Sequence, residues 1–152
     1  MLKIRMLAIP VIFALTLLQA CNYSGSDNSS SPSPLYSNSA SVSTPEEVIE
    51  AYAKGWEDRD PAAVSALFAD DGLYKDPSKP LGIRGKELEE YIVYVGDTYK
   101  DHDFKKGETV KIDATHYRFD WWFESKEGII SLKGFDEVEI VEGKIKLLQG
   151  QF

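Results

Sequence analysis

The stretch IISLKGFDEVEIVEGKIKLLQGQF, residues 129–152, decides the fold of this 152-residue chain. Polarity alternates along it, and Glu142-Gly143 interrupts the alternation with a dipeptide suited to a tight turn, so two antiparallel strands are expected. One face of the first strand carries only apolar residues or glycine, apart from Asp136. Burying a lone carboxylate is costly unless it is paired, hydrogen-bonded or protonated. Asp136 is therefore expected to have a structural partner or a place in a site.

The neighbours of Asp136 on this inner face are predicted by counting across two-residue turns at 127–128 and 142–143. The first turn places Phe119 opposite Asp136 and Trp121 opposite Gly134, where the indole can cover the gap that glycine leaves. A four-residue loop would shift this pairing by two residues and keep the same face. The second turn places Gln149 opposite Asp136. The predicted wall around Asp136 is Tyr117, Phe119, Trp121 and Gln149.

Residues 1–20 have the pattern of a signal peptide, since Lys3 and Arg5 precede an apolar run too short to span a membrane. Leu18-Gln19-Ala20-Cys21 resembles a bacterial lipobox, which implies cleavage before Cys21 and lipid attachment to it. The alternative is a plain signal peptide with an incidental cysteine. We expect a lipid-anchored protein of the cell envelope. The outer membrane, facing the periplasm, is favoured because Asn22 differs from the aspartate that retains lipoproteins at the inner membrane.

Residues 21–43 are rich in Ser, Asn and Pro and predict a flexible tether in front of one domain at 44–152. The formal net charge of −8 argues against nucleic acid and anionic lipid as partners. We therefore expect the protein to contact the membrane only through its lipid anchor. Phosphate-binding, nucleophile and zinc motifs are not found, and no cofactor or metal is expected. Asp101-His102-Asp103 is interpreted as a solvated loop.

Three helices are predicted before the strands, which gives an α+β fold. Thr44-Pro45-Glu46-Glu47 has the pattern of a capping box that starts a helix running to about Asp58. A short second helix follows Asp60-Pro61 and stops at 70–72; a short strand at 73–75 and a rigid loop at 76–80 come next. The third helix runs from 84–85 to about Tyr99, and strands at 104–112 and 116–124 precede the two described above.

This order of elements resembles the nuclear transport factor 2-like (NTF2-like) superfamily, with the SnoaL-like polyketide cyclase branch nearest. The resemblance spans about 44–152 and rests on Trp56, Phe68, Tyr74-Lys75-Asp76-Pro77, residues 82–85, Gly134-Phe135-Asp136 and Gly143-Lys144-Ile145. It implies a curved sheet wrapped around helices into a cystatin-like cone, with a pocket at the open end and a homodimer formed through the sheet. It also implies an acid/base role for Asp136 with help from a histidine. Alternation, however, puts His116, the candidate on the adjoining strand, on the outer face.

Three interpretations of Asp136 stay open: a structural partner, with Arg84 as the best cation for it; a polar anchor in a ligand pocket; or a general acid/base whose pKa the apolar wall raises. The expected function is binding of a small apolar molecule or a partner protein in an aromatic-lined pocket. The alternatives are an acid/base enzyme of the cyclase, isomerase or dehydratase type, or a scaffold whose own side chains fill the pocket. On the outer face, Trp122 and Phe135 would suit a dimer interface. The candidate pocket residues are Trp56, Tyr74, Asp76, Tyr91, Tyr117, Phe119, Trp121 and Gln149, together with Asp136.

Overall fold

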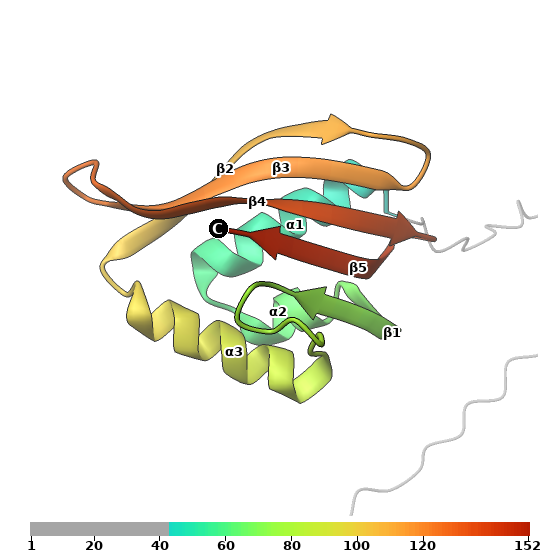
Figure 1. Cartoon of the computed structure of the whole chain (residues 1–152), viewed down its shortest axis with the longest axis horizontal. Helices are drawn as coiled ribbons and strands as arrows, with labels where there is room; N and C mark the ends of the chain where they lie inside the picture. The colour runs from blue at the N-terminus through green and yellow to red at the C-terminus, as the bar shows by residue number, and fades with distance from the viewer. Residues whose placement is uncertain (1–42) are drawn as a thin grey trace, which may run out of the picture. The chain divides into compact units, whose positions relative to one another are not determined.

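The computed structural model describes residues 43–152, and all structural statements below concern this part of the chain. The predicted signal peptide, Cys21 and nearly all of the predicted tether lie outside the described residues. The elements follow in the order α1 (Pro45–Asp58), α2 (Pro61–Ser65), β1 (Phe68–Lys75), α3 (Gly85–Thr98), β2 (His102–Lys111), β3 (His116–Ser125), β4 (Ile130–Val141) and β5 (Lys144–Gln151) (Figure 1). Helices come before most of the sheet, so the α+β prediction is confirmed.

Helix α1 begins with the capping box that its sequence predicts. The Thr44 hydroxyl accepts a 3.3 Å hydrogen bond from the Glu47 N–H, and the Glu47 carboxylate accepts one of 2.8 Å from the Thr44 N–H. The helix ends after Asp58, where Arg59 has a φ of 55°. Its apolar face is buried, and Tyr52 and Trp56 lie one turn apart on that face.

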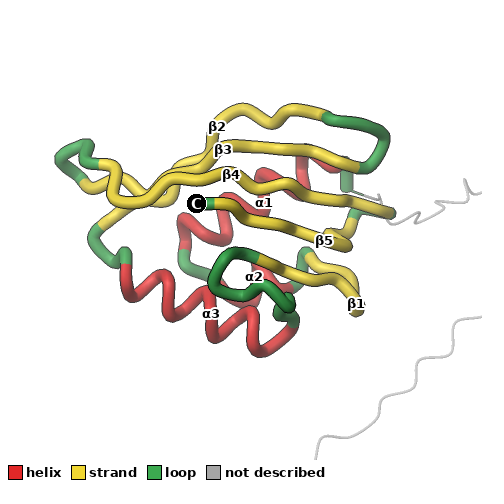
Figure 2. Tube along the Cα trace, in the orientation of Figure 1, coloured by secondary structure: helices red, strands yellow, loops and turns green. Residues whose placement is uncertain are grey.

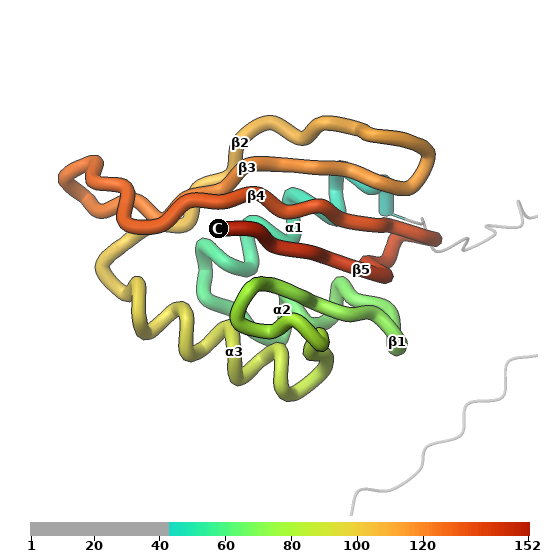
Figure 3. Tube along the Cα trace, viewed as in Figure 1, coloured from blue at the N-terminus to red at the C-terminus, as the bar shows by residue number. Residues whose placement is uncertain are grey.

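The five strands form one sheet in the order β1-β5-β4-β3-β2. β1 runs parallel to β5, and all other neighbours are antiparallel. In Figures 1 and 2, α1 lies behind the strands and α3 runs beside β1. The β3–β4 hairpin, orange in Figure 3, extends beyond the end of β5. The inner face of the sheet is therefore covered by helices, and the space between them holds the core.

The predicted pairing of β3 with β4 is confirmed around Asp136. Phe119 pairs with Asp136, Trp121 with Gly134, and Phe123 with Leu132. The connection at 126–129 is longer than the two-residue loop predicted. The pairing shifts between Phe123 and Glu124, so the pairs further from the turn keep the predicted register. The inner-face position of Asp136 is thereby fixed, and this side chain is 3% exposed.

The predicted pairing of β4 with β5 is wrong beyond the turn. Val141 pairs with Lys144 and Ile140 with Ile145 as expected. Between Ile140 and Glu139 the pairing becomes irregular, so that from Glu139 back to Phe135 each partner on β5 lies one residue further along than predicted. Asp136 consequently pairs with Gly150, and Gln149 pairs with Glu137. Because side chains alternate between faces, this one-residue shift turns Gln149 to the exposed outer face.

Two local predictions also need correction. The second helix was predicted to continue to about residue 70, but it ends at Ser65 and β1 begins at Phe68. The strand starts this early because Phe68 pairs with Ile145 of the parallel strand β5. Asp101-His102-Asp103 was predicted as a loop, but β2 already begins at His102. The Nε2 of His102 lies 2.6 Å from the Ser131 hydroxyl. Within the described residues, no helix is long and apolar enough to cross a membrane.

Candidate functional site

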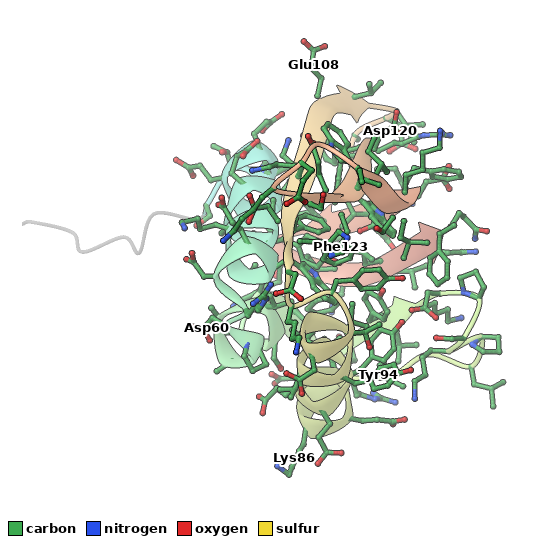
Figure 4. The ribbon with its side chains drawn as sticks, turned by 90° about the vertical axis from the view of Figure 1, so that its left-hand side faces the viewer. Asp60, Lys86, Tyr94, Glu108, Asp120 and Phe123 are labelled. Carbon is green, nitrogen blue, oxygen red and sulfur yellow. The ribbon has the colours of Figure 1, made fainter. Side chains whose placement is uncertain are left out.

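A cavity of about 220 Å³ lies between the inner face of the sheet and the helices α1 and α3. Figure 4 shows Phe123, one of its wall residues, inside the fold near the C-terminal end of α3, whereas Lys86 and Glu108 project outward. None of the lining side chains is basic. Ten are aromatic: Tyr52, Trp56, Tyr74, Tyr91, Tyr94, Tyr99, Phe104, Trp121, Phe123 and Phe152.

The aromatic residues form two walls. On the first, the rings of Trp56 and Trp121 both stack on Phe104, with centroids 6.0 Å apart in each pair. On the second, Tyr91 packs between Tyr74 at 5.6 Å and Tyr94 at 6.5 Å. The buried rings among them have few alternative rotamers, whereas Tyr94 is mostly exposed to solvent. The cavity therefore offers preformed flat apolar surfaces.

Asp136 on β4 is the acidic group of the cavity. Its Oδ1 accepts a 2.8 Å hydrogen bond from the Trp121 indole, and its Oδ2 accepts one of 3.3 Å from the Tyr52 hydroxyl. Burial raises the pKa of Asp136 to about 7, although both hydrogen bonds oppose the rise, and the nearby charge of Asp76 adds to it. Among the described residues, no cation forms an ion pair with Asp136. The predicted partner Arg84 is exposed at the start of α3.

Asp76 lies behind the cavity, in the loop after β1, and is 4% exposed. It accepts hydrogen bonds from the hydroxyls of Tyr91 at 2.5 Å and Tyr74 at 3.1 Å, which both line the cavity. It also accepts bonds from the Ser78 N–H, the Ser78 hydroxyl and the Lys79 N–H. Burial would raise the pKa of Asp76, but these bonds hold it below its ordinary value. Asp76 is thus an ionised anchor for both the loop and one tyrosine wall.

The two carboxylates lie on either side of Gly150. A Cβ on Gly150 would meet Asp136 Oδ1 at 3.1 Å and the Asp76 Cβ at 3.5 Å. A side chain at this position of β5 would crowd both residues, so glycine allows the two aspartates to lie close to each other. Because like charges disfavour each other, the ionised Asp76 favours the protonated form of Asp136.

The structure brings some of the predicted pocket residues together and separates others. Trp56, Tyr74, Tyr91, Trp121 and Asp136 line the cavity. Tyr117 and Phe119 are buried in the core and do not line it, Asp76 holds two of its tyrosines by hydrogen bonds, and Gln149 lies on the outer face.

His116 is on the outer face as predicted. Its Nδ1 lies 3.0 Å from the Asp113 carboxylate, and this contact raises the pKa of His116. The structure therefore gives Asp136 no histidine partner from β3.

Several cavity residues were not predicted from sequence. Val95 and Tyr99 follow Tyr91 at helical spacing, so the stripe that predicted α3 already contained this signal. Phe104 and Phe123 belong to the inner faces of predicted strands and could have been found by alternation. Phe152 ends the stretch predicted as strand, but the predicted pairing, with Gln149 opposite Asp136, put it on the outer face.

Comparisons with known proteins bear on the fold. No family model matches the sequence, and no curated protein matches it. Among solved structures, a proposed isomerase of the SnoaL-like family from Agrobacterium tumefaciens has a TM-score of 0.58 at 22% identity, covering 68% of this chain and 92% of that one. A proposed polyketide cyclase from Sinorhizobium meliloti has a TM-score of 0.57 at 17% identity, covering 71% and 95%.

A third similar structure is a protein with a ketosteroid isomerase-like fold from Catenulispora acidiphila, in complex with trimethylamine. Its TM-score is 0.54 at 19% identity, and the match covers 72% of this chain and 87% of that one. At these identities the likeness concerns the fold alone. The chain has the cystatin-like α+β fold found in NTF2-like and SnoaL-like proteins.

Proposed function

We propose that this SnoaL-like domain binds a small, largely apolar molecule in its aromatic cavity. The observation that carries the proposal is the cavity of about 220 Å³, which the protein's own side chains leave unfilled. An apolar protein cavity of about 150 Å³ is enough to bind benzene, so this one suits roughly one or two rings. This space supports ligand binding over a scaffold whose own side chains fill the cone. The trimethylamine complex of the Catenulispora protein involves a small organic molecule as well.

The binding proposal can be tested by filling the cavity. Val95 on α3 lines it, whereas Val93 on the same helix is 50% exposed and does not. Ligand-observed NMR with indole and naphthalene should show binding to the wild type and to Val93→Trp but not to Val95→Trp. Equal binding by all three proteins would place the ligand elsewhere and contradict the proposal.

An acid/base reaction is the second candidate function, favoured by a carboxyl with a pKa of about 7 that faces the cavity. In an isomerisation of this type, the Asp136 carboxylate removes the α-proton of a β,γ-unsaturated ketone. The resulting dienolate then takes the proton back at its γ-carbon, which restores the carboxylate. The probe is 3-cyclohexen-1-one, followed by NMR. Asp136→Asn should abolish conversion to the conjugated ketone while His116→Gln retains it. Equal rates in both variants would rule out this use of Asp136.

We propose that the domain is held on the cell envelope by lipid on Cys21, from the lipobox and the signal-peptide pattern before it. The test is labelling of cells with a radioactive fatty acid. Wild type should be labelled and Cys21→Ser should be neither labelled nor processed by the lipoprotein pathway. Equal labelling of the variant would reject the lipobox.

A homodimer through the outer face of the sheet is proposed from Trp122 and Phe135, which are both half-buried there. Trp122 donates a 2.8 Å hydrogen bond to Glu124, and the Arg118 guanidinium lies 3.7 Å above the centre of the Phe135 ring. Light scattering at micromolar concentration should report a dimer for wild type and a monomer for Trp122→Lys. A monomer in both cases would leave this face for a different partner protein or for solvent.

A further inference from the structure

The charged groups in and next to the cavity lining are carboxylates, apart from the Lys79 ammonium, which lies outside the lining with its Nζ 5.5 Å from the centre of the Tyr91 ring. Asp136 lies in its wall, Asp76 lies directly behind that wall, and no lining residue carries a positive charge. The low dielectric of an aromatic enclosure lets such charges act over longer distances than in water. An anionic molecule would be repelled here, whereas a cation would find no basic group competing for the same carboxylate.

The aromatic walls favour the same kind of ligand. The π-faces of Trp, Tyr and Phe attract cations, and tryptophan is the strongest of the three. Trp56 and Trp121 belong to one aromatic cluster of the lining, and Tyr74, Tyr91 and Tyr94 form another, in which the Lys79 ammonium already lies 5.5 Å from the centre of the Tyr91 ring. A quaternary ammonium group can use these surfaces without any hydrogen-bond acceptor, because its charge is spread over methyl groups. Two independent features, ring faces and carboxylates, therefore select one ligand chemistry.

We propose that the cavity takes a small organic ammonium cation, of the alkyl- or aryl-ammonium class, in preference to neutral or anionic molecules of the same shape. This inference rests on the proposed binding function and names its ligand class.

Binding of such a cation depends on the ionisation of Asp136, because the ionised carboxylate attracts the cation and the protonated acid does not. The groups that face Asp136 are Tyr52 from α1, Trp121 from β3, Tyr74 from β1 and Asp76 across Gly150 of β5; Tyr91 from α3 contacts Asp76. Burial raises the pKa of each of these tyrosines, so they stay neutral, and Asp76 is anionic. Affinity for the cation should therefore rise with pH as Asp136 ionises.

The test compares two probes of the same shape, phenyltrimethylammonium and its neutral isostere tert-butylbenzene, by NMR titration of the full chain. At pH 8 the cation should bind about tenfold more tightly than the isostere, and this preference should fall several-fold at pH 5.5. Asp136→Asn should remove most of the preference and leave tert-butylbenzene binding intact. Asp120→Asn, which removes an exposed charge from the outer face of β3, should retain it.

Each other outcome has a definite meaning. If neither probe binds, the proposed binding function itself fails. If tert-butylbenzene binds as tightly as the cation at pH 8, the cavity is apolar without charge selection and the ammonium inference is overturned. The same conclusion follows if Asp120→Asn lowers the preference as much as Asp136→Asn, because the effect would then be one of overall charge. If a variant fails to fold, the pH series on wild type still tests whether the preference for the cation falls at low pH.

Discussion

The indole N–H of Trp121 donates a 2.8 Å hydrogen bond to Oδ1 of Asp136, although these residues are not direct partners in the sheet. Trp121 pairs with Gly134, and Asp136 pairs with Phe119. Gly134 has no side chain, so the indole can lie over it and extend diagonally to the carboxylate two residues further along β4. The glycine, the tryptophan and the aspartate therefore act as one unit in the cavity wall.

Asp136→Asn should remove a pH dependence of stability. The folded-state pKa of about 7 lies above the ordinary aspartate value of 3.8, so the folded state holds the proton more tightly than the unfolded state. Stability should therefore fall as pH rises from about 4 to 7, by about 2–4 kcal/mol. At pH 8 Asp136→Asn should be more stable than wild type, at pH 5 this difference should be smaller, and near pH 4 the two should be similar.

Urea unfolding at pH 5 and pH 8 checks this prediction. His116 also has a raised pKa and loses stabilisation as pH rises, so the comparison is the difference between wild type and Asp136→Asn, in which that contribution cancels. A wild type that is clearly more stable at pH 8, with the advantage absent from the variant, would show that Asp136 is a paired structural carboxylate.

Tyr52→Phe should raise the pKa of Asp136 further. Burial and the neighbouring Asp136 keep the pKa of Tyr52 well above its ordinary value, so its hydroxyl is a stable donor that favours the ionised carboxylate. Removing the donor favours the protonated acid. The carboxyl ¹³C shift of Asp136, followed against pH, should titrate about half a unit or more higher than in wild type. Tyr94→Phe, at a ring that is 66% exposed, should leave the titration unchanged.

Asp76→Asn should destabilise the domain and lower the pKa of Asp136. The loss of a charged acceptor that holds Tyr74, Tyr91 and the 78–79 turn should cost about 2–4 kcal/mol at pH 7. Because the folded pKa of Asp76 is depressed, this contribution is present above its unfolded pKa and is lost as pH falls through the folded value. Thermal melts at pH 7 and pH 3 should show the cost shrinking in acid. An Asp136 titration that does not move would mean that the two carboxylates are independent.

Gly134→Ala should disrupt the contact between β4, β5 and Trp121. A Cβ at this position would lie 2.1 Å from the Gln151 carbonyl oxygen and 2.8 Å from the Trp121 ring, so backbone has to move. We expect a loss of about 2–4 kcal/mol in the free energy of unfolding. Gly107→Ala on β2 is the matched control, because its nearest contact would be 3.4 Å away. Equal effects of both substitutions would show that Trp121 and β5 adapt freely.

Local patterns in the sequence determined much of this structure. The capping box at Thr44 started α1, and the period of two along β4 placed Asp136 inward among aromatic residues. The pairing of Trp121 with Gly134 was predicted from the fit of a large ring over a glycine, and it holds although the connecting turn is longer than predicted. These features depend on residues close together in the chain or on one hairpin, so the sequence alone specifies them.

Contacts between distant segments decided the rest. β1 is an eight-residue strand because it pairs in parallel with β5. No local sequence pattern predicts this pairing between distant segments. The pairing shift between Glu139 and Ile140 exchanged Gln149 for Gly150 beside Asp136, and Asp76 gained Tyr91 as a hydrogen-bond partner only when α3 packed near the end of β1. Alternation fixes which residues share a face of one strand, but a single irregularity in pairing reverses that face for everything beyond it. The composition of the site therefore depends on how the strands and helices pack, whereas the inward position of Asp136 depends on the sequence of β4 alone.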